Sequence, residues 1–119
     1  MLGLIGQISM RAKEIDRATA FYRDTLGLPL LFRAGTLSFF NCGGIRLMLS
    51  LPEPDFDHPG SVLYFKVDDI TATHETLVSR GVSIMKEPHM IARMPDHELW
   101  MSFFHDSEGN TLALMQEKR

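Results

Sequence analysis

Short runs of apolar and polar positions follow one another along the chain in an order that occurs twice. Residues 4–10 alternate like a strand, with the polar side chains of Gln7 and Ser9 on one face. Residues 14–26 have the period of a helix, and Gly27 is placed to end it. Three further strands are predicted at residues 28–33, 36–40 and 45–50. The first half is therefore predicted to fold in the order βαβββ.

The second half repeats this order. A strand at residues 61–67 is followed by a helix that begins at Asp68 or Asp69 and ends at Gly81. The later strands are predicted at residues 82–86, 99–104 and 111–115, and residues 86–98 are predicted to be an inserted loop without a counterpart in the first half. Alignment of the two halves matches Gln7 with Val62, Ile15 with Ile70, Gly27 with Gly81, Ser38 with Ser102, and Met48 with Ala113.

Each predicted helix carries one apolar stripe that is suited to cover one face of a sheet. The stripes consist of Ile15, Ala18, Phe21, Tyr22 and Leu26 (or Thr25), and of Ile70, Thr73, His74, Leu77 and Val78. Between the halves, prolines and a glycine mark residues 52–60 as a linker. We therefore predict one α+β domain, residues 1–119, in which module 1 (residues 1–51) and module 2 (residues 61–119) form a curved mixed sheet around a groove.

Composition narrows the classes of function. The net charge of −3 argues against nucleic-acid binding, which requires a basic face. The single cysteine, Cys42, excludes an intrachain disulfide, and no apolar run approaches the roughly 20 residues of a membrane span. Residues 1–6 are apolar but lack a basic region, so they are interpreted as part of the first strand and not as a signal peptide. We predict a cytoplasmic protein without nucleic-acid or membrane partners.

Two motifs resemble the vicinal oxygen chelate superfamily, which includes glyoxalase I, extradiol dioxygenases and bleomycin resistance proteins. Residues 14–28, EIDRATAFYRDTLGL, are similar to the helical signature of that family. Residues 103–114, FFHDSEGNTLAL, are similar to its closing hairpin. The resemblance covers essentially the whole chain and implies the fold, but it does not specify the reaction.

In that family a divalent metal usually lies in the groove, and the resemblance places its ligands at Gln7, Met48, Val62 and Ala113. Only Gln7 offers a hard oxygen donor, because valine and alanine have none and methionine offers a soft thioether. A catalytic metal needs about three protein ligands. We therefore predict no metal or other cofactor. A rebuilt site from Gln7, Glu98 and either His89 or His97 is the alternative.

Strand alternation extends the predicted groove beyond these four positions. The predicted lining is apolar and rich in methionine, which suits a small hydrophobic or aromatic ligand, and Arg46 is suited to anchor a carboxylate or phosphate. The predicted groove residues are Gln7, Ser9, Arg46, Met48, Val62, Tyr64, His97, Met101, Phe103 and Ala113. His89, Glu98 and Trp100 are possible contributors from the inserted loop, with Trp100 expected on the opposite face.

Two functions stay open from the sequence. The first is a protein that binds a small molecule in a metal-free groove. The second is an enzyme (a lyase, isomerase or dioxygenase) with a non-standard metal site, for which no catalytic residue can be named. Cys42 lies in a predicted turn without a neighbouring base, so it does not indicate a nucleophile. A homodimer is implied by the resemblance and removes exposed strand edges.

Overall fold

Two four-stranded sheets form the framework of the protein in a computed structural model that describes residues 1–54 and 60–119. Contacts divide the chain into one unit at Met1–Gly60 and a second at Ser61–Arg119. The predicted linker falls at the end of the first unit, and its residues 55–59, which include His58, lie outside the described residues.

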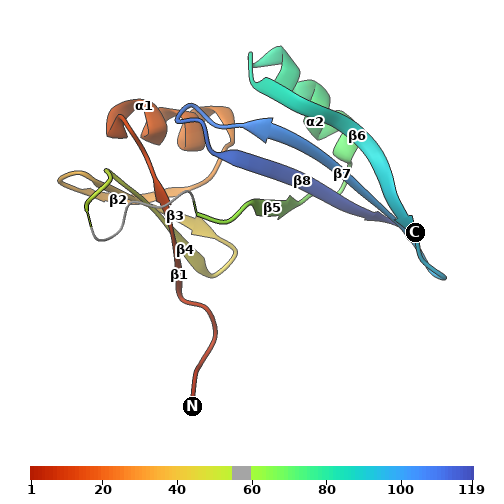
Figure 1. The fold of residues 1–119 in the computed structure, drawn as a ribbon, viewed down its shortest axis with the longest axis horizontal. Helices are drawn as coiled ribbons and strands as arrows, with labels where there is room; N and C mark the ends of the chain where they lie inside the picture. Colours follow the sequence, from red (N-terminus) through yellow and green to blue (C-terminus); the bar gives the residue numbers. More distant parts are fainter. Residues whose placement is uncertain (55–59) are drawn as a thin grey trace. The chain divides into compact units, whose positions relative to one another are not determined.

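The first unit has the order βαβββ. Its strands are β1 (Gln7–Arg11), β2 (Leu30–Ala34), β3 (Leu37–Cys42) and β4 (Ile45–Ser50). Between β1 and β2, the helix α1 (Ile15–Ala20) continues into a π-helical turn, η1 (Phe21–Thr25). The strands lie in the order β1-β4-β3-β2, with β1 parallel to β4 and the other pairs antiparallel (Figure 1).

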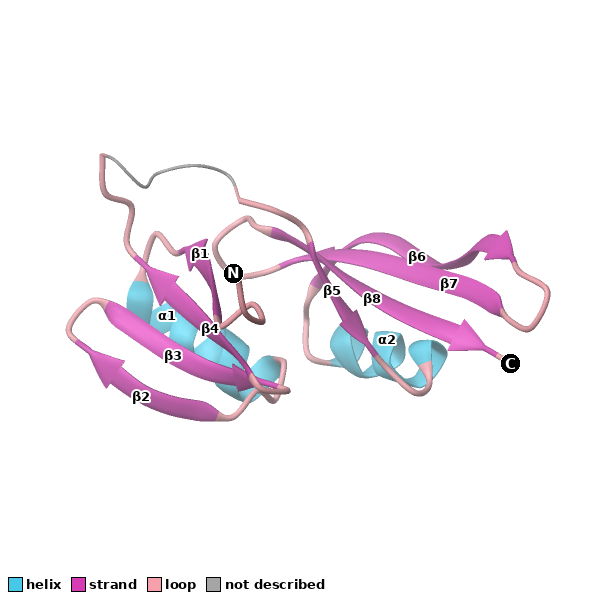
Figure 2. Ribbon diagram, turned by 90° about the horizontal axis from the view of Figure 1, so that it is seen from below, coloured by secondary structure: helices cyan, strands magenta, loops and turns pink. Residues whose placement is uncertain are grey.

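The second unit has the same order. It contains β5 (Leu63–Lys66), α2 (Ile70–Ser79), β6 (Ser83–Arg93), β7 (Glu98–His105) and β8 (Thr111–Lys118). Its sheet has the order β5-β8-β7-β6, and the only parallel pair described in it is again the first strand with the last. In each unit the helix covers one face of the sheet (Figure 2). The α+β class and the repeated βαβββ order are confirmed, whereas the joining of both sheets around a groove stays a prediction.

Strand register reproduces the alignment of the two halves. Ser9 pairs with Met48 across β1 and β4, and Tyr64 pairs with Ala113 across β5 and β8. These two pairs occupy equivalent places, since the alignment matches Gln7 with Val62, and so Ser9 with Tyr64, and matches Met48 with Ala113. The two sheets therefore have matching backbone positions, but different residue types occupy them.

The cores lie between each sheet and its helix. In the first unit, the fully buried rings of Tyr22 and Phe40 lie 5.9 Å apart between their centroids. Beside them, the buried hydroxyl groups of Thr19 and Ser38 share a hydrogen bond, so both are satisfied in an apolar surrounding. In the second unit Phe104, the equivalent of Phe40, is also buried.

The apolar N-terminal segment is not part of the first strand, so that prediction is wrong. Residues 1–6 are exposed and run away from β1 (Figure 1), which begins at Gln7. The neighbouring strand β4 begins at Ile45, and its register with β1 starts at the pair Gln7 and Arg46. Because β4 begins at Ile45, no described strand lies beside residues 1–5, and their apolar side chains alone do not make them part of β1.

The prediction of a loop at residues 86–98 is also wrong. Strand β6 continues to Arg93 and β7 begins at Glu98, so only a short turn separates them. The segment has no counterpart in the first half because it lengthens the strands instead, and Pro88 is tolerated within β6 because β6 is the edge strand of its sheet. The register of β6 with β7 also shifts between Lys86 and His89, which absorbs the missing hydrogen bond.

Both helices end as predicted, but two helical details differ. Gly27 and Gly81 follow the helices with φ of 76° and 79°, a conformation that side chains rarely adopt. The last turn of the first helix is π-helical, which the spacing of apolar residues does not distinguish from α. Val78, predicted in the buried stripe of α2, is 51% exposed. No helix in the described part of the chain has the length and hydropathy that crossing a membrane requires.

Candidate functional site

The open face of the first sheet, opposite α1, carries four of the predicted groove residues. Alternation along β1 and β4 directs Met10, Leu47 and Leu49 into the core. The same alternation places the intervening side chains on the other face. These are Gln7, Ser9, Arg46 and Met48, which the structure therefore brings together on one surface.

Gln7 and Arg46 are held together at the start of the β1–β4 pair. Arg46 Nε donates a hydrogen bond of 2.8 Å to Gln7 Oε1. The amide nitrogen of Gln7 lies 3.7 Å from Met48 Sδ and donates to this thioether. Both ends of the Gln7 amide are thus engaged, and because Gln7 is exposed its polar group carries no burial cost. The carbonyl oxygen that a metal would need is already directed at a permanent cation.

An aromatic platform lies beside this polar pair. The guanidinium carbon of Arg46 is 5.1 Å from the centroid of the Phe39 ring, within the range of a cation–π interaction. Phe39 in turn stacks on Phe32 of the neighbouring strand, with 4.5 Å between ring centroids and 23° between planes. We refer to Gln7, Arg46, Phe39 and Phe32 as the arginine platform. It combines a charged group with two flat apolar surfaces.

A hollow of about 420 Å³ borders the arginine platform along β4. Met48 connects the two, because its thioether accepts a hydrogen bond from Gln7 of the platform and its side chain lines the hollow. The hollow is lined by Ser9, Leu37, Met48, Ser50, Leu51 and Glu53. Its walls are mostly apolar, with one carboxylate at the rim, and its size suits a small organic molecule.

The open face of the second sheet carries an aromatic cluster. The rings of Tyr64 and Phe103 lie 6.0 Å apart in an edge-to-face arrangement, and His89 lies 6.4 Å from Phe103. In register, Ala113 lies between Tyr64 and Phe103 and is fully buried. Its methyl group leaves the space in which the two rings meet. Val62 comes one residue before β5 and is 40% exposed.

The remaining predicted contributors lie elsewhere in the second unit. His97 is in the turn before β7, where its Nδ1 is 2.8 Å from Asp96 Oδ1. Glu98 accepts a hydrogen bond from the Trp100 indole and forms an ion pair with Arg93. Met101 pairs with Met115, which places it on the same face as Phe103. Trp100 alternates with Met101 and lies on the helix side, as expected.

The residues at the four family positions do not fit a hard divalent cation. Within the first unit, the Gln7 oxygen is taken by Arg46 and the neighbouring atom is a thioether. Within the second unit, the equivalent positions are Val62 and Ala113, and the rings of Tyr64 and Phe103 meet beside Ala113. Among the described residues no group of three or more histidine, cysteine, aspartate or glutamate side chains is arranged to hold a metal. Neither set supplies the oxygen or nitrogen ligands such a metal requires.

Cys42 is the last residue of β3, paired with Ile45, and not a turn residue as predicted. Partial burial raises the pKa of its thiol. Because the thiolate is the reactive form, we expect iodoacetamide to alkylate Cys42 more slowly in the folded protein than in the urea-unfolded chain near pH 8. The difference should shrink as the pH rises above both pKa values. Mass spectrometry of timed samples measures both rates, and faster alkylation of the folded protein would contradict the expectation.

Phe39, Phe32, Leu37 and Glu53 were missed by sequence reasoning. For Phe39 a signal was present, because the alignment of the halves makes it the equivalent of Phe103, which was predicted. Phe32 and Leu37 required the pairing of β2 with β3, which contains a register shift that no pattern of apolar residues reveals. Glu53 lies in the predicted linker, where no regular alternation exists.

Comparisons with known proteins agree over nearly the whole length. Residues 4–114 match the Glyoxalase/Bleomycin resistance protein/Dioxygenase superfamily. A glyoxylase-like domain-containing protein from Didymella fabae is 29% identical, covering 94% of this chain and 92% of the relative. A probable lactoylglutathione lyase from Vibrio cholerae is 25% identical, covering 92% and 88%. The crystal structure of a superfamily member from Sphaerobacter thermophilus has a TM-score of 0.80 at 25% identity and covers 98% of both chains.

Proposed function

Because the chain belongs to the glyoxalase/bleomycin resistance protein/dioxygenase superfamily, we propose that it binds a small aromatic molecule on the open face of its first sheet, without a metal ion. Membership alone leaves both binding and catalysis open, since the superfamily includes resistance proteins as well as enzymes. The choice between them rests on the residues that occupy this face.

The arginine platform is the observation that carries the proposal. Arg46 is held at two points, by the hydrogen bond to Gln7 Oε1 and by its position over Phe39. A guanidinium fixed in this way loses little further freedom when it binds a ligand, so it is preorganised. Its two terminal nitrogens make no hydrogen bond with any described residue. They are therefore suited to bind an anionic group, while Phe32, which is 45% exposed, provides a surface for a ring and the buried Phe39 supports both Phe32 and Arg46.

The same contacts disfavour a metal at this place. A divalent cation on the Gln7 oxygen would have to displace or approach the guanidinium of Arg46, and the two positive charges repel each other. The thioether of Met48 is a poor ligand for hard cations. We infer that the ligand itself supplies the negative charge, as an aromatic carboxylate does, and that the hollow beside Met48 receives its apolar part.

Substitution of the platform tests the proposal with naphthoate as the probe. We expect Arg46→Ala to weaken naphthoate binding about tenfold, since a charge-assisted hydrogen bond contributes about 1.5–3 kcal/mol. Gln7→Ala should weaken it less, because the arginine keeps its charge but loses its orientation. Naphthamide, which lacks the charge, should bind weakly to the native protein. Isothermal titration calorimetry measures all of these affinities.

Arg33→Ala is the matched control. Arg33 lies in the same sheet but forms its ion pair with Asp16 of the helix, on the covered side. Its removal changes the net charge by the same amount and should leave naphthoate binding intact. The proposal is wrong if Arg46→Ala and Arg33→Ala have the same effect, or if naphthoate does not bind the native protein.

A metal titration tests the metal-free part separately. We expect no calorimetric signal for Mn²⁺, Ni²⁺ or Zn²⁺ corresponding to a dissociation constant below about 0.1 mM, a limit near weak sites in proteins. Tighter binding that is lost in Gln7→Ala would favour the alternative, an enzyme with a non-standard metal site. Binding that survives this substitution would place the metal elsewhere and leave the arginine platform unaffected.

A further inference from the structure

A second hollow lies in the second unit, on the side of the sheet that faces the helix. It has a volume of about 550 Å³ and is bordered by α2, β6 and β7. We refer to it as the α2–β6 cleft and define it by His74, Glu75, Val78, Glu87, Pro88 and Trp100. Trp100 alternates with Met101 and Phe103, so the cleft and the aromatic cluster occupy opposite faces of the sheet.

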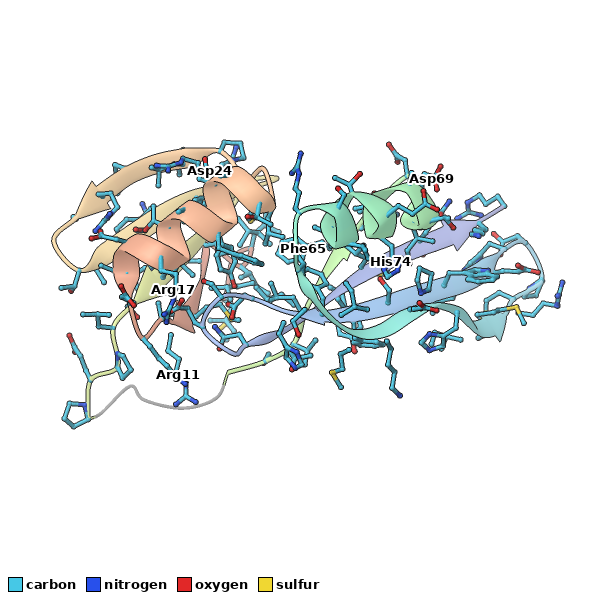
Figure 3. The ribbon with its side chains drawn as sticks, turned by 90° about the horizontal axis from the view of Figure 1, so that it is seen from above. Arg11, Arg17, Asp24, Phe65, Asp69 and His74 are labelled. Carbon is cyan, nitrogen blue, oxygen red and sulfur yellow. The ribbon has the colours of Figure 1, made fainter. Side chains whose placement is uncertain are left out.

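The cleft arises from the position of α2 on the sheet. Ile70 and Leu77 are the buried residues of the helix, whereas Thr71, His74, Glu75 and Val78 form an adjacent stripe along the cleft. In Figure 3, His74 extends from α2 toward the strands of the second sheet. Val78 is 51% exposed there, although an apolar residue at this spacing would ordinarily be covered. The helix therefore leaves a mostly polar strip of its own surface along the cleft, in which Val78 is the exposed apolar residue.

Trp100 lines the cleft with its ring, and its polar edge is already engaged. The indole nitrogen already donates a hydrogen bond of 3.0 Å to Glu98 Oε1, which fixes the orientation of the ring. Lys118 Nζ lies 4.0 Å from the ring centroid, so the ring is already in a cation–π interaction. Lys118 borders another hollow, beside Arg93 and His97, and is not part of the cleft.

The charged groups of the cleft are carboxylates. Glu75 on α2 and Glu87 on β6 border it from two sides, and neither forms an ion pair with a described residue. Among the described residues no lysine or arginine lines the cleft, although Lys118 lies over the ring of Trp100. Its chemistry is thus the reverse of the arginine platform, where a guanidinium faces aromatic rings.

We propose that the α2–β6 cleft binds an organic cation with an aromatic or aliphatic body, as a site separate from the arginine platform. The ammonium group of such a compound is attracted by Glu75 and Glu87. Its body contacts Val78, Pro88 and the ring of Trp100, the apolar part of the lining. The ligand class follows from charge complementarity and from the fixed ring, and it does not depend on what the first unit binds.

Trp100 is the only tryptophan of the chain, so its fluorescence reports directly on the cleft. Titration with benzyltrimethylammonium should give a saturable change in tryptophan emission, and added salt should weaken the binding. Benzenesulfonate, an anion of similar size, should give no saturable change. The proposal is overturned if the cation gives no saturable change, or if the anion binds at Trp100 equally well.

Two pairs of variants locate the binding. Val78→Lys places a cation inside the cleft at an exposed helical position and should reduce affinity for benzyltrimethylammonium at least about tenfold. Thr76→Lys adds the same charge to the same helix outside the cleft and should bind nearly as the native protein does. Glu87→Gln should weaken binding about threefold, in the range of an exposed charge pair, and its control Asp68→Asn should not.

Circular dichroism checks that each variant is folded. If Val78→Lys does not fold, the double variant Glu75→Gln with Glu87→Gln replaces it, and unchanged affinity in that variant overturns the proposal. Arg46→Ala should bind benzyltrimethylammonium like the native protein. A loss of cation binding in Arg46→Ala would contradict the claim that the two sites are separate. Failure of the native protein to bind naphthoate would contradict only the proposal for the arginine platform and not that for the cleft.

Discussion

Replacement of Phe40 by alanine is expected to lower the free energy of unfolding by about 3–5 kcal/mol, the range for removing a buried aromatic ring from a packed core. Phe40 is fully buried on β3, and its ring lies 5.9 Å from that of Tyr22, which is also fully buried. The cavity is expected to stay open, because the surrounding side chains are held by a sheet on one side and a helix on the other. Urea denaturation followed by circular dichroism measures the loss.

Phe32→Ala is the matched control for this prediction. Phe32 is 45% exposed on the open face of the same sheet, so its removal leaves no closed cavity. We expect its effect on the free energy of unfolding to be about 1 kcal/mol, close to the worth of an aromatic pair such as Phe32 and Phe39. Comparable losses for Phe40→Ala and Phe32→Ala would mean that the core does not lie between the sheet and α1.

Replacement of Asp106 by alanine is expected to lower the free energy of unfolding by about 3 kcal/mol, since it leaves buried donors without their acceptor. Asp106 Oδ1 accepts hydrogen bonds of 2.8 Å from the backbone nitrogens of Glu108 and Asn110. Its Oδ2 accepts a third, of 2.7 Å, from Asn110 Nδ2. Asp106 and Asn110 are both buried, so water does not replace these bonds cheaply. This network holds the turn between β7 and β8.

Two further variants separate the hydrogen bonds from the charge. Asp106→Asn keeps an acceptor for the two backbone nitrogens but opposes a second amide to Asn110 Nδ2, so we expect an intermediate loss. Ser107→Ala removes only the hydrogen bond from Ser107 Oγ to Glu108 Oε2 and should cost least. If Asp106→Ala is no more destabilising than Ser107→Ala in thermal unfolding, the turn is not held by the aspartate.

The repeat made most of the fold predictable. The βαβββ order was recognised twice and is confirmed, and the aligned residues Met48 and Ala113 lie at equivalent places in the two sheets. What alternation does not encode is the reach of a strand. The predicted lengths of the first strand and of β6 were both wrong, because a segment forms a strand only where another strand lies beside it. The described register of β1 with β4 begins at Gln7, whereas β6 pairs with β7 along its length.

The candidate site was predictable only in part, for a related reason. Gln7, Arg46 and Met48 lie on one face because strand parity places them there. The contacts that give them a chemical role, such as the donation from Arg46 to Gln7 Oε1, depend on rotamers that no sequence pattern contains. The α2–β6 cleft was not predicted at all, since its lining comes from a helix and two strands that only the fold brings together. The homodimer and the cytoplasmic location stay predictions.

The division of each strand between a covered and an open face also bears on how such a chain evolves. Stability resides in residues such as Phe40 and Leu49, which point to the helix, whereas Met48 and Arg46 point away from it. Mutations on the open face therefore meet little selection for folding. Substitutions that change what this face binds can therefore accumulate through steps that each leave a folded protein. Ligand specificity can then change more quickly in evolution than the fold does.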